Sequence, residues 1–203
     1  MTHEALNLAK DSFKLEAKTI LDTGKNMDWE AFATAVALLS KAPRIAVSGC
    51  GHSGIACRHF AHSLCCIERP ARFLSPSEAV HGATGFLQPG DVLITASRGG
   101  KTSELIPIID IARQKGSFVL SITENHDSPM AQKSDVILPM KVHRETDRYD
   151  AQGTSSFVSL SAIFDALQVA VMEETGYKGT QFALTHPGGA VGERLNKKTE
   201  VTN

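Results

Sequence analysis

The chain has 203 residues, of which 42% are hydrophobic and 21% are charged, and its formal net charge is −1. This composition is typical of a soluble globular protein with one substantial core. The near-zero charge disfavours nucleic acid and acidic membrane surfaces as partners, and no apolar run approaches the ~20 residues that span a bilayer. The polar N-terminus does not resemble a secretory signal, and the four cysteines form no C-x-x-C pair. We therefore expect a cytoplasmic protein with reduced thiols.

The predicted elements begin with two helices. Apolar residues recur at helical spacing over residues 4–22, and Asp28 is the expected N-cap of a second helix over 28–41. Short apolar runs with the length of buried strands follow at 44–49, 71–75, 91–97, 117–123 and 135–140. Helix-like stretches lie between or after these runs at 53–66, 102–115, 128–133 and about 154–175.

This alternation predicts an α/β fold in which a five-stranded parallel sheet lies between helices. We expect residues 1–43 to form N-terminal helices, 44–195 to form a ligand-binding domain and 196–203 to form a tail. The helix over 4–22 has no obvious partner within the chain before the sheet begins. We therefore expect it to pack between subunits of an oligomer.

The first expected strand leads into the loop VSGCGHSG, residues 47–54, where Gly49, Gly51 and Gly54 have the spacing G-x-G-x-x-G. This spacing is found where a strand turns into a helix beside a phosphate, including in dinucleotide sites. A dinucleotide site needs an acidic residue at the end of the second strand, and that strand ends here in Ser75 and Pro76. The sequence therefore disfavours a nicotinamide cofactor.

Two further polar loops favour a smaller phosphorylated ligand. The loop ASRGGKTSE, residues 96–104, brings hydroxyl groups and the cations Arg98 and Lys101 to the start of an expected helix, and GTSS, residues 153–156, opens the long helix. Helix N-termini favour anions, and loops after parallel strands meet at one edge of a sheet. The alternative is an ordinary helix cap, with Thr102 as the cap and Glu104 in the first turn.

These stretches, together with SPSEAVHGATG (75–85) and FALTHPGGAVGERL (182–195), resemble the sugar isomerase (SIS) domain family. Within that family the chain is most similar to the arabinose-5-phosphate isomerases, over about residues 42–195. The resemblance implies an αβα sandwich and a homotetramer whose sites are shared between subunits. It also implies the interconversion of ribulose 5-phosphate and arabinose 5-phosphate, with a phosphosugar as the small-molecule partner.

The resemblance also implies roles for individual residues. Glu145 matches the glutamate thought to act as base, Glu104 matches a site carboxylate, and His81 matches a histidine reached across a subunit boundary. His186, before a Pro-Gly-Gly turn, is a candidate for opening the sugar ring. The simpler interpretations are a surface glutamate and structural histidines. The predicted substrate-binding residues are Gly51, His52, Ser53, Ser97, Arg98, Gly99, Gly100, Lys101, Thr102, Thr154 and Ser155.

The chain also departs from the family pattern. His52 stands where the first loop usually has a lysine, the second loop usually reads S-N-S-G-E-S, and Ala83 replaces a frequent acidic residue. The two C-terminal CBS modules of the usual members are not expected here. No metal-ligand spacing links Cys50 to the histidines, and an enediol mechanism needs no metal or cofactor, so neither is expected. The competing hypothesis is a phosphosugar-binding sensor without catalysis.

Overall fold

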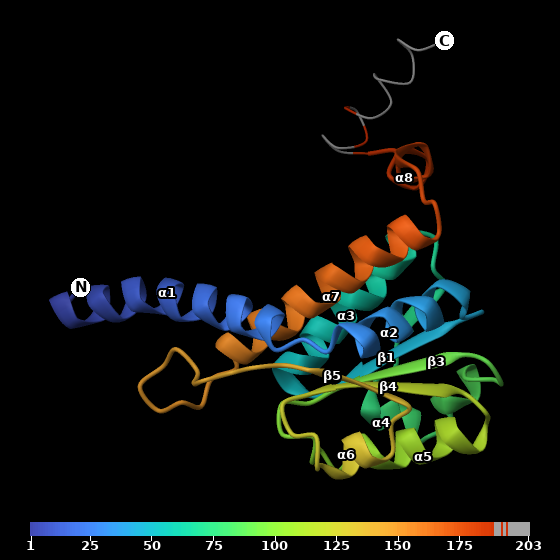
Figure 1. Ribbon diagram of the computed structural model, residues 1–203, viewed down its shortest axis with the longest axis horizontal. Helices are drawn as coiled ribbons and strands as arrows, with labels where there is room; N and C mark the ends of the chain where they lie inside the picture. Colours follow the sequence, from blue (N-terminus) through green and yellow to red (C-terminus); the bar gives the residue numbers. More distant parts are fainter. Residues whose placement is uncertain (189–191, 193, 195–203) are drawn as a thin grey trace.

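The computed structural model describes residues 1–188, 192 and 194 (Figure 1). Its centre is a five-stranded sheet with the order β2-β1-β3-β4-β5, in which neighbouring strands are parallel. The strands are β1 (Ile45–Gly49), β2 (Ala71–Phe73), β3 (Val92–Ala96), β4 (Phe118–Thr123) and β5 (Val136–Pro139). The predicted parallel sheet is therefore confirmed.

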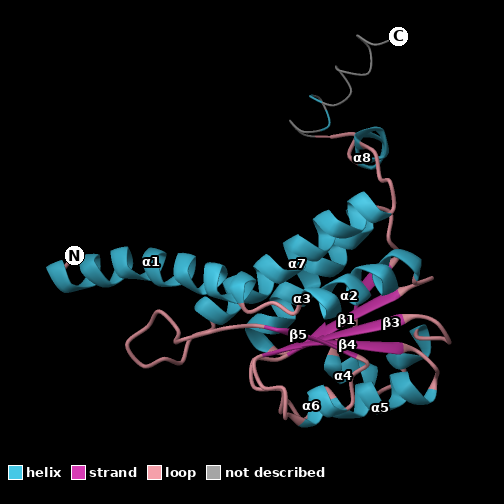
Figure 2. Cartoon of the chain, in the orientation of Figure 1, coloured by secondary structure: helices cyan, strands magenta, loops and turns pink. Residues whose placement is uncertain are grey.

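Helices cover both faces of the sheet (Figure 2). One face carries α1 (His3–Lys25), α2 (Trp29–Lys41), α3 (Gly51–Cys66) and α7 (Ser155–Glu174). The other carries α4 (Pro76–Ala79), the 3-10 helix η1 (Ala83–Phe86), α5 (Ile106–Gln114) and α6 (Pro129–Gln132). A short helix, α8 (Gly179–Thr185), follows α7. This is the expected αβα sandwich.

Each strand supplies alternate side chains to two separate cores, because successive strand residues point to opposite faces. In β1, Ile45 and Val47 belong to the core under α2, α3 and α7, whereas Ala46 belongs to the core under α5. Phe60 of α3 and Phe164 of α7 stack in the first core with ring centroids 4.2 Å apart. The continuous apolar strands that the sequence shows follow from burial on both faces.

Among the described residues, α7 has the length and apolar composition of a membrane-crossing helix. The expectation that no apolar run approaches the ~20 residues of a membrane span therefore missed this helix. Its residues Ile163, Phe164 and Leu167 are nevertheless buried in the first core. Core helices of globular proteins share this composition, because they are apolar on more than one side.

The helix α1 projects from the body of the molecule (Figure 1). Its C-terminal part is tied to α7 by a hydrogen bond of 2.8 Å between the hydroxyls of Thr23 and Ser159. Phe13 and Leu21 of the same helix are 79% and 65% exposed. These exposed apolar side chains are in keeping with the expectation that α1 packs between subunits, which stays a prediction.

The largest boundary error concerns the helix expected from residue 102, which begins at Ile106. Residues before it form a turn in which the Leu105 N–H donates to the carbonyl of Thr102 at 3.1 Å. Pro107 suits a first turn because it lacks a backbone N–H. Thr102 is therefore not the cap of α5. The helices α4, η1 and α8 were not predicted, and the expected tail 196–203 lies outside the described residues.

Candidate functional site

The glycines of the first loop allow α3 to start very close to β1. Gly51 has a positive φ of 55°, a conformation that favours glycine. A Cβ atom at Gly54 would meet the carbonyl oxygen of Gly49 at 2.6 Å. The spacing G-x-G-x-x-G is therefore explained by a tight turn and by close helix–strand packing, and it places the exposed His52 and the half-buried Ser53 at the edge of the sheet.

The second loop folds back on itself through its hydroxyl groups. The side chains of Ser97 and Thr102 form a hydrogen bond of 2.8 Å, and the Gly100 N–H donates to Ser97 Oγ at 3.2 Å. Gly100 has a φ of 63°, and a Cβ atom there would lie 2.1 Å from Ser128 Oγ. Gly99 and Lys101 are exposed on the outer side of the loop. The loop thus presents two neighbouring hydroxyls on a backbone that is fixed by packing.

The third loop meets the protein's own carboxylate. Glu145 is 3% exposed, and its Oε2 accepts hydrogen bonds from the Thr154 N–H at 2.9 Å, the Thr154 hydroxyl at 3.2 Å and the Ser156 N–H at 3.1 Å. These donors form the N-terminus of α7, where a negative charge is stabilised. Thr154 was expected to bind the ligand, but in the structure its N–H and its hydroxyl donate to Glu145. The Ser155 hydroxyl is buried and has no hydrogen-bond partner within the described part of the chain.

Arg98 holds the second oxygen of Glu145. One guanidinium NH₂ group donates to Glu145 Oε1 at 2.9 Å, and Nε donates to Glu124 Oε2 at 3.1 Å. Arg98 was expected to bind a phosphate, but in the structure it pairs with two carboxylates. Sequence reasoning missed Glu124, although its position directly after β4 is where parallel sheets place site residues.

The pKa of Glu145 reflects opposing effects. Burial raises the pKa, but the hydrogen bonds from Ser156 and Thr154 and the charge of Arg98 outweigh burial and lower it below its ordinary value. Glu145 is therefore a carboxylate at neutral pH. Its two oxygens are bound from two sides, one by the start of α7 and one by Arg98.

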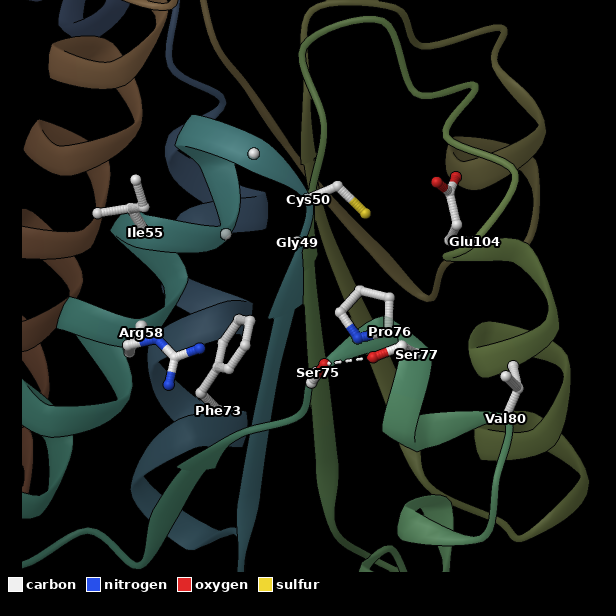
Figure 3. A pocket seen from close by; sticks show the side chains of 12 residues that line it. Gly49, Cys50, Ile55, Arg58, Phe73, Ser75, Pro76, Ser77, Val80 and Glu104 are labelled. Carbon is white, nitrogen blue, oxygen red and sulfur yellow. Dashed lines mark hydrogen bonds between the residues drawn. The ribbon is translucent and has the colours of Figure 1, made fainter.

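A cavity of about 490 Å³ lies between the first loop and α4 (Figure 3). Cys50 and Glu104 point toward each other across it, and Ser75 and Ser77 form its polar floor through a hydrogen bond of 3.0 Å. Burial and the charge of Glu104 raise the pKa of the Cys50 thiol. Glu104 itself is exposed, and hydrogen bonds from its own backbone N–H and from the Ser103 hydroxyl lower its pKa. The cavity therefore offers hydroxyls, a protonated thiol and a carboxylate to a polar ligand.

The histidines divide into two groups. A Cβ atom at Gly153 would lie 2.9 Å from the side chain of His52, so His52 borders the third loop beside Thr154. His81 is exposed between α4 and η1. His186 is the C-cap of α8 and stacks on Phe182 with ring centroids 3.7 Å apart.

Within one chain, His186 lies far from Glu145. The helix α7 starts beside Glu145, and its 20 residues span about 30 Å. The helix α8 follows this distant end (Figure 1), and its Gln181 binds Glu68 just beyond the C-terminus of α3. The structure therefore brings together the three loops, His52, Arg98 and Glu145, but it does not bring His186 to them. No group of three metal-ligating side chains occurs among the residues that the structure describes.

Comparisons with known proteins place this geometry in context. The profile of the SIS domain matches residues 38–170. The arabinose 5-phosphate isomerase KdsD of Pseudomonas aeruginosa is 34% identical over 163 residues, which are 80% of this chain and 50% of the relative. The chain thus spans about half the length of the curated relatives it matches.

Two solved structures share the fold. A candidate sugar-phosphate isomerase from Listeria monocytogenes superposes with a TM-score of 0.89 at 39% identity, covering 93% of this chain and 100% of that chain. The protein c3406 of Escherichia coli CFT073, in complex with A5P, superposes with a TM-score of 0.85 at 26% identity, covering 92% of this chain and 100% of that chain.

Proposed function

Because the chain belongs to the SIS domain family, we propose that it is an aldose–ketose isomerase that interconverts D-ribulose 5-phosphate and D-arabinose 5-phosphate. The names of its relatives and the A5P bound to a similar structure support this choice of substrate. The observation that carries the proposal is the buried, ionised Glu145 beside a loop that presents paired hydroxyls. This proton transfer requires a base beside the reacting carbon, next to a loop that binds the phosphate of the sugar.

In this proposal the first two loops bind the phosphate, and the loop after β5 supplies the base. The hydroxyls of Ser53, Ser97 and Thr102 hold the distal phosphate, with Lys101 supplying positive charge at the rim. The base removes the proton from C2 of the aldose while the carbonyl oxygen at C1 gains a proton, which gives an enediol. Returning a proton to C1, with loss of the proton from the C2 hydroxyl, completes the ketose. Polar groups near the two oxygens, including His52, stabilise the charge that develops there.

Glu145 is the proposed base, and its surroundings fit that role once ligand is bound. In the structure its pKa is low, and a weak base is a poor catalyst. A phosphosugar dianion close to the carboxylate raises the pKa through like-charge repulsion. Oε2 accepts three hydrogen bonds from the start of α7, whereas Oε1 accepts one, from Arg98, so we propose that Oε1 accepts the proton. Glu104, in the cavity, is the second candidate.

The remaining two candidates act in this proposal from neighbouring subunits. His186 is at the far end of α7 from Glu145 in its own chain, so a ring-opening role requires the His186 of another subunit. His81 is exposed on the surface and is free to reach a neighbour's site. A homotetramer with shared sites, which the resemblance implies, accommodates both.

Both oxygens of Glu145 accept hydrogen bonds from the protein itself. This observation favours one alternative function, a phosphosugar-binding module without catalysis. Incubating the purified protein with ribulose 5-phosphate and following aldose formation separates the two functions. An isomerase forms arabinose 5-phosphate, whereas a sensor binds the sugar phosphate in calorimetry without converting it. Repeating the assay with other pentose and hexose phosphates defines the substrate.

A further inference from the structure

We infer that Arg98 is a positioning residue for Glu145 rather than a ligand of the phosphate. The inference rests on the proposed function, because it assigns to Arg98 the task of holding the proposed base in place. The resemblance does not provide this role, since the family pattern has a different residue at this position of the second loop.

The guanidinium of Arg98 is bound on three sides. Besides the bonds to Glu124 and Glu145, an NH₂ group lies 3.4 Å from the carbonyl oxygen of Val142. Arginine presents its N–H groups in a rigid planar fork. The side chain therefore cannot turn toward a phosphate without breaking contacts to the loops after both β4 and β5. Through these contacts Arg98 links three loops at the carboxyl edge of the sheet.

The contact also covers the carboxylate. The side chain of Arg98 is 34% exposed, whereas that of Glu145 is 4% exposed. The start of α7 binds Oε2 of Glu145, and the more exposed Arg98 binds Oε1. A lysine at this position carries all its N–H donors on one nitrogen, so it cannot reproduce the planar fork in which three different nitrogens of Arg98 bind Glu124, Glu145 and the carbonyl.

Other charges around Glu145 do not replace Arg98. Glu124 faces the same guanidinium from the loop after β4, and Asp150 accepts the backbone N–H of Glu145 within the loop after β5. His52 borders the loop from α3. His143, two residues away, is turned toward Asp22 of α1 at 2.7 Å. Removing Arg98 therefore leaves Glu145 near two carboxylates, with the N-terminus of α7 as its main source of positive potential.

The test compares Arg98→Met and Arg98→Lys with the control Glu124→Gln, which keeps the contact between Arg98 and Glu145. We expect Arg98→Met to lower kcat by about 10²-fold through misplacement of the base. The acid limb of its kcat–pH profile is expected to move up by about one to three pH units. The KM should change less than twofold, and Arg98→Lys should recover part of kcat. A raised KM with an unmoved acid limb would identify Arg98 as a phosphate ligand and overturn the inference.

A second measurement keeps the inference separate from the proposed activity. The carboxyl ¹³C resonance of Glu145, assigned by its loss in Glu145→Gln, is titrated in the wild-type protein and in both Arg98 variants. We expect the apparent pKa to rise in Arg98→Met and to rise less in Arg98→Lys. If Arg98→Met does not fold, Arg98→Lys alone tests the inference, and a raised apparent pKa of Glu145 in that variant supports it. An unchanged apparent pKa of Glu145 overturns the inference, whether or not the protein isomerises sugars. A raised apparent pKa in a protein that has no isomerase activity overturns only the proposed function.

Discussion

The carboxylate of Glu145 accepts a hydrogen bond from the backbone N–H of Thr154 at 2.9 Å, so the Glu145 side chain holds the loop after β5 against the N-cap of α7. The N-terminus of a helix is an anion site, and here the anion belongs to the protein. The same contact explains why Glu145 is ionised although it is buried. It also places the proposed base next to the edge where the first two loops meet.

The low pKa of Glu145 predicts a pH-dependent contribution to stability. Because the folded-state pKa lies below the unfolded value, about 4.3, the contribution is present above that value and is lost as the pH falls through the folded pKa. At pH 7 we expect Glu145→Gln to reduce the free energy of unfolding by about 1.5–3 kcal/mol, the range for hydrogen bonds to a charged group. Urea denaturation at a series of pH values measures the difference, which should shrink below about pH 4. A difference that is constant with pH would contradict the assignment.

The positive φ and close packing of Gly100 predict that Gly100→Ala disrupts the second loop. A left-handed backbone costs a non-glycine residue roughly 1–2 kcal/mol, and the added Cβ would also collide with Ser128. The matched control is Gly99→Ala, whose Cβ would meet nothing within 4 Å. Urea denaturation should show a loss for Gly100→Ala and a change within about 0.5 kcal/mol for the control. Equal effects would mean that the loop does not depend on its contact with Ser128.

The hydroxyl of Thr102 is predicted to bind the phosphate. Thr102→Val keeps the shape of the side chain but removes its hydroxyl, which leaves Ser97 Oγ with the Gly100 N–H and without the Thr102 hydroxyl. We expect phosphosugar binding to weaken by about 1–3 kcal/mol, the cost of an unmet polar contact. Thr102→Ser, which keeps a hydroxyl, is the control. Calorimetry that finds the same affinity for the valine variant would remove Thr102 from the phosphate site.

Much of the fold was predictable because it follows from local patterns. Buried parallel strands read as short apolar runs, and the alternation of such runs with helices determines the class of sheet. The start of α5 was missed although Pro107 is a local signal of a helix's first turn. Short helices such as α4 and η1 lack the periodicity that identifies longer ones.

The side-chain partners at the site were less predictable. Arg98 was expected to face a phosphate, yet its partners lie 26 and 47 residues further along the chain. Thr154 was expected to face a ligand, but its N–H and hydroxyl donate to Glu145. Such pairings depend on how three separate loops fold over the sheet. The sequence could predict that these residues gather at one edge, and not which of them bind one another.

The distance between His186 and Glu145 predicts that two inactive variants can complement each other. If sites are shared, mixing Glu145→Gln with His186→Asn after dissociation and reassembly should restore activity, because some sites then carry both wild-type residues. Reassembly of each variant alone is the control. Activity that stays absent in the mixture would place His186 outside the site or within its own chain's site.

A separate measurement addresses the task of His186. If His186 opens the sugar ring, His186→Asn should slow the reaction of the cyclic aldose phosphate more than that of the open-chain ketose phosphate. Single-turnover rates in both directions isolate this step from product release. Equal losses in both directions would assign His186 to the shared enediol step.

The central claim is that Glu145 is the base of a phosphosugar isomerase. The most direct measurement is the reaction of D-ribulose 5-phosphate in D₂O, followed by NMR, with the wild-type protein and a folded Glu145→Gln variant. We predict that the wild type forms D-arabinose 5-phosphate carrying deuterium at C2. The variant should bind the sugar phosphate with little change, because a base contributes mainly in the transition state, but should react about 10²–10⁴-fold more slowly. A fully active variant, or a wild-type protein that binds the sugar phosphate without product formation or deuterium exchange, would contradict the claim.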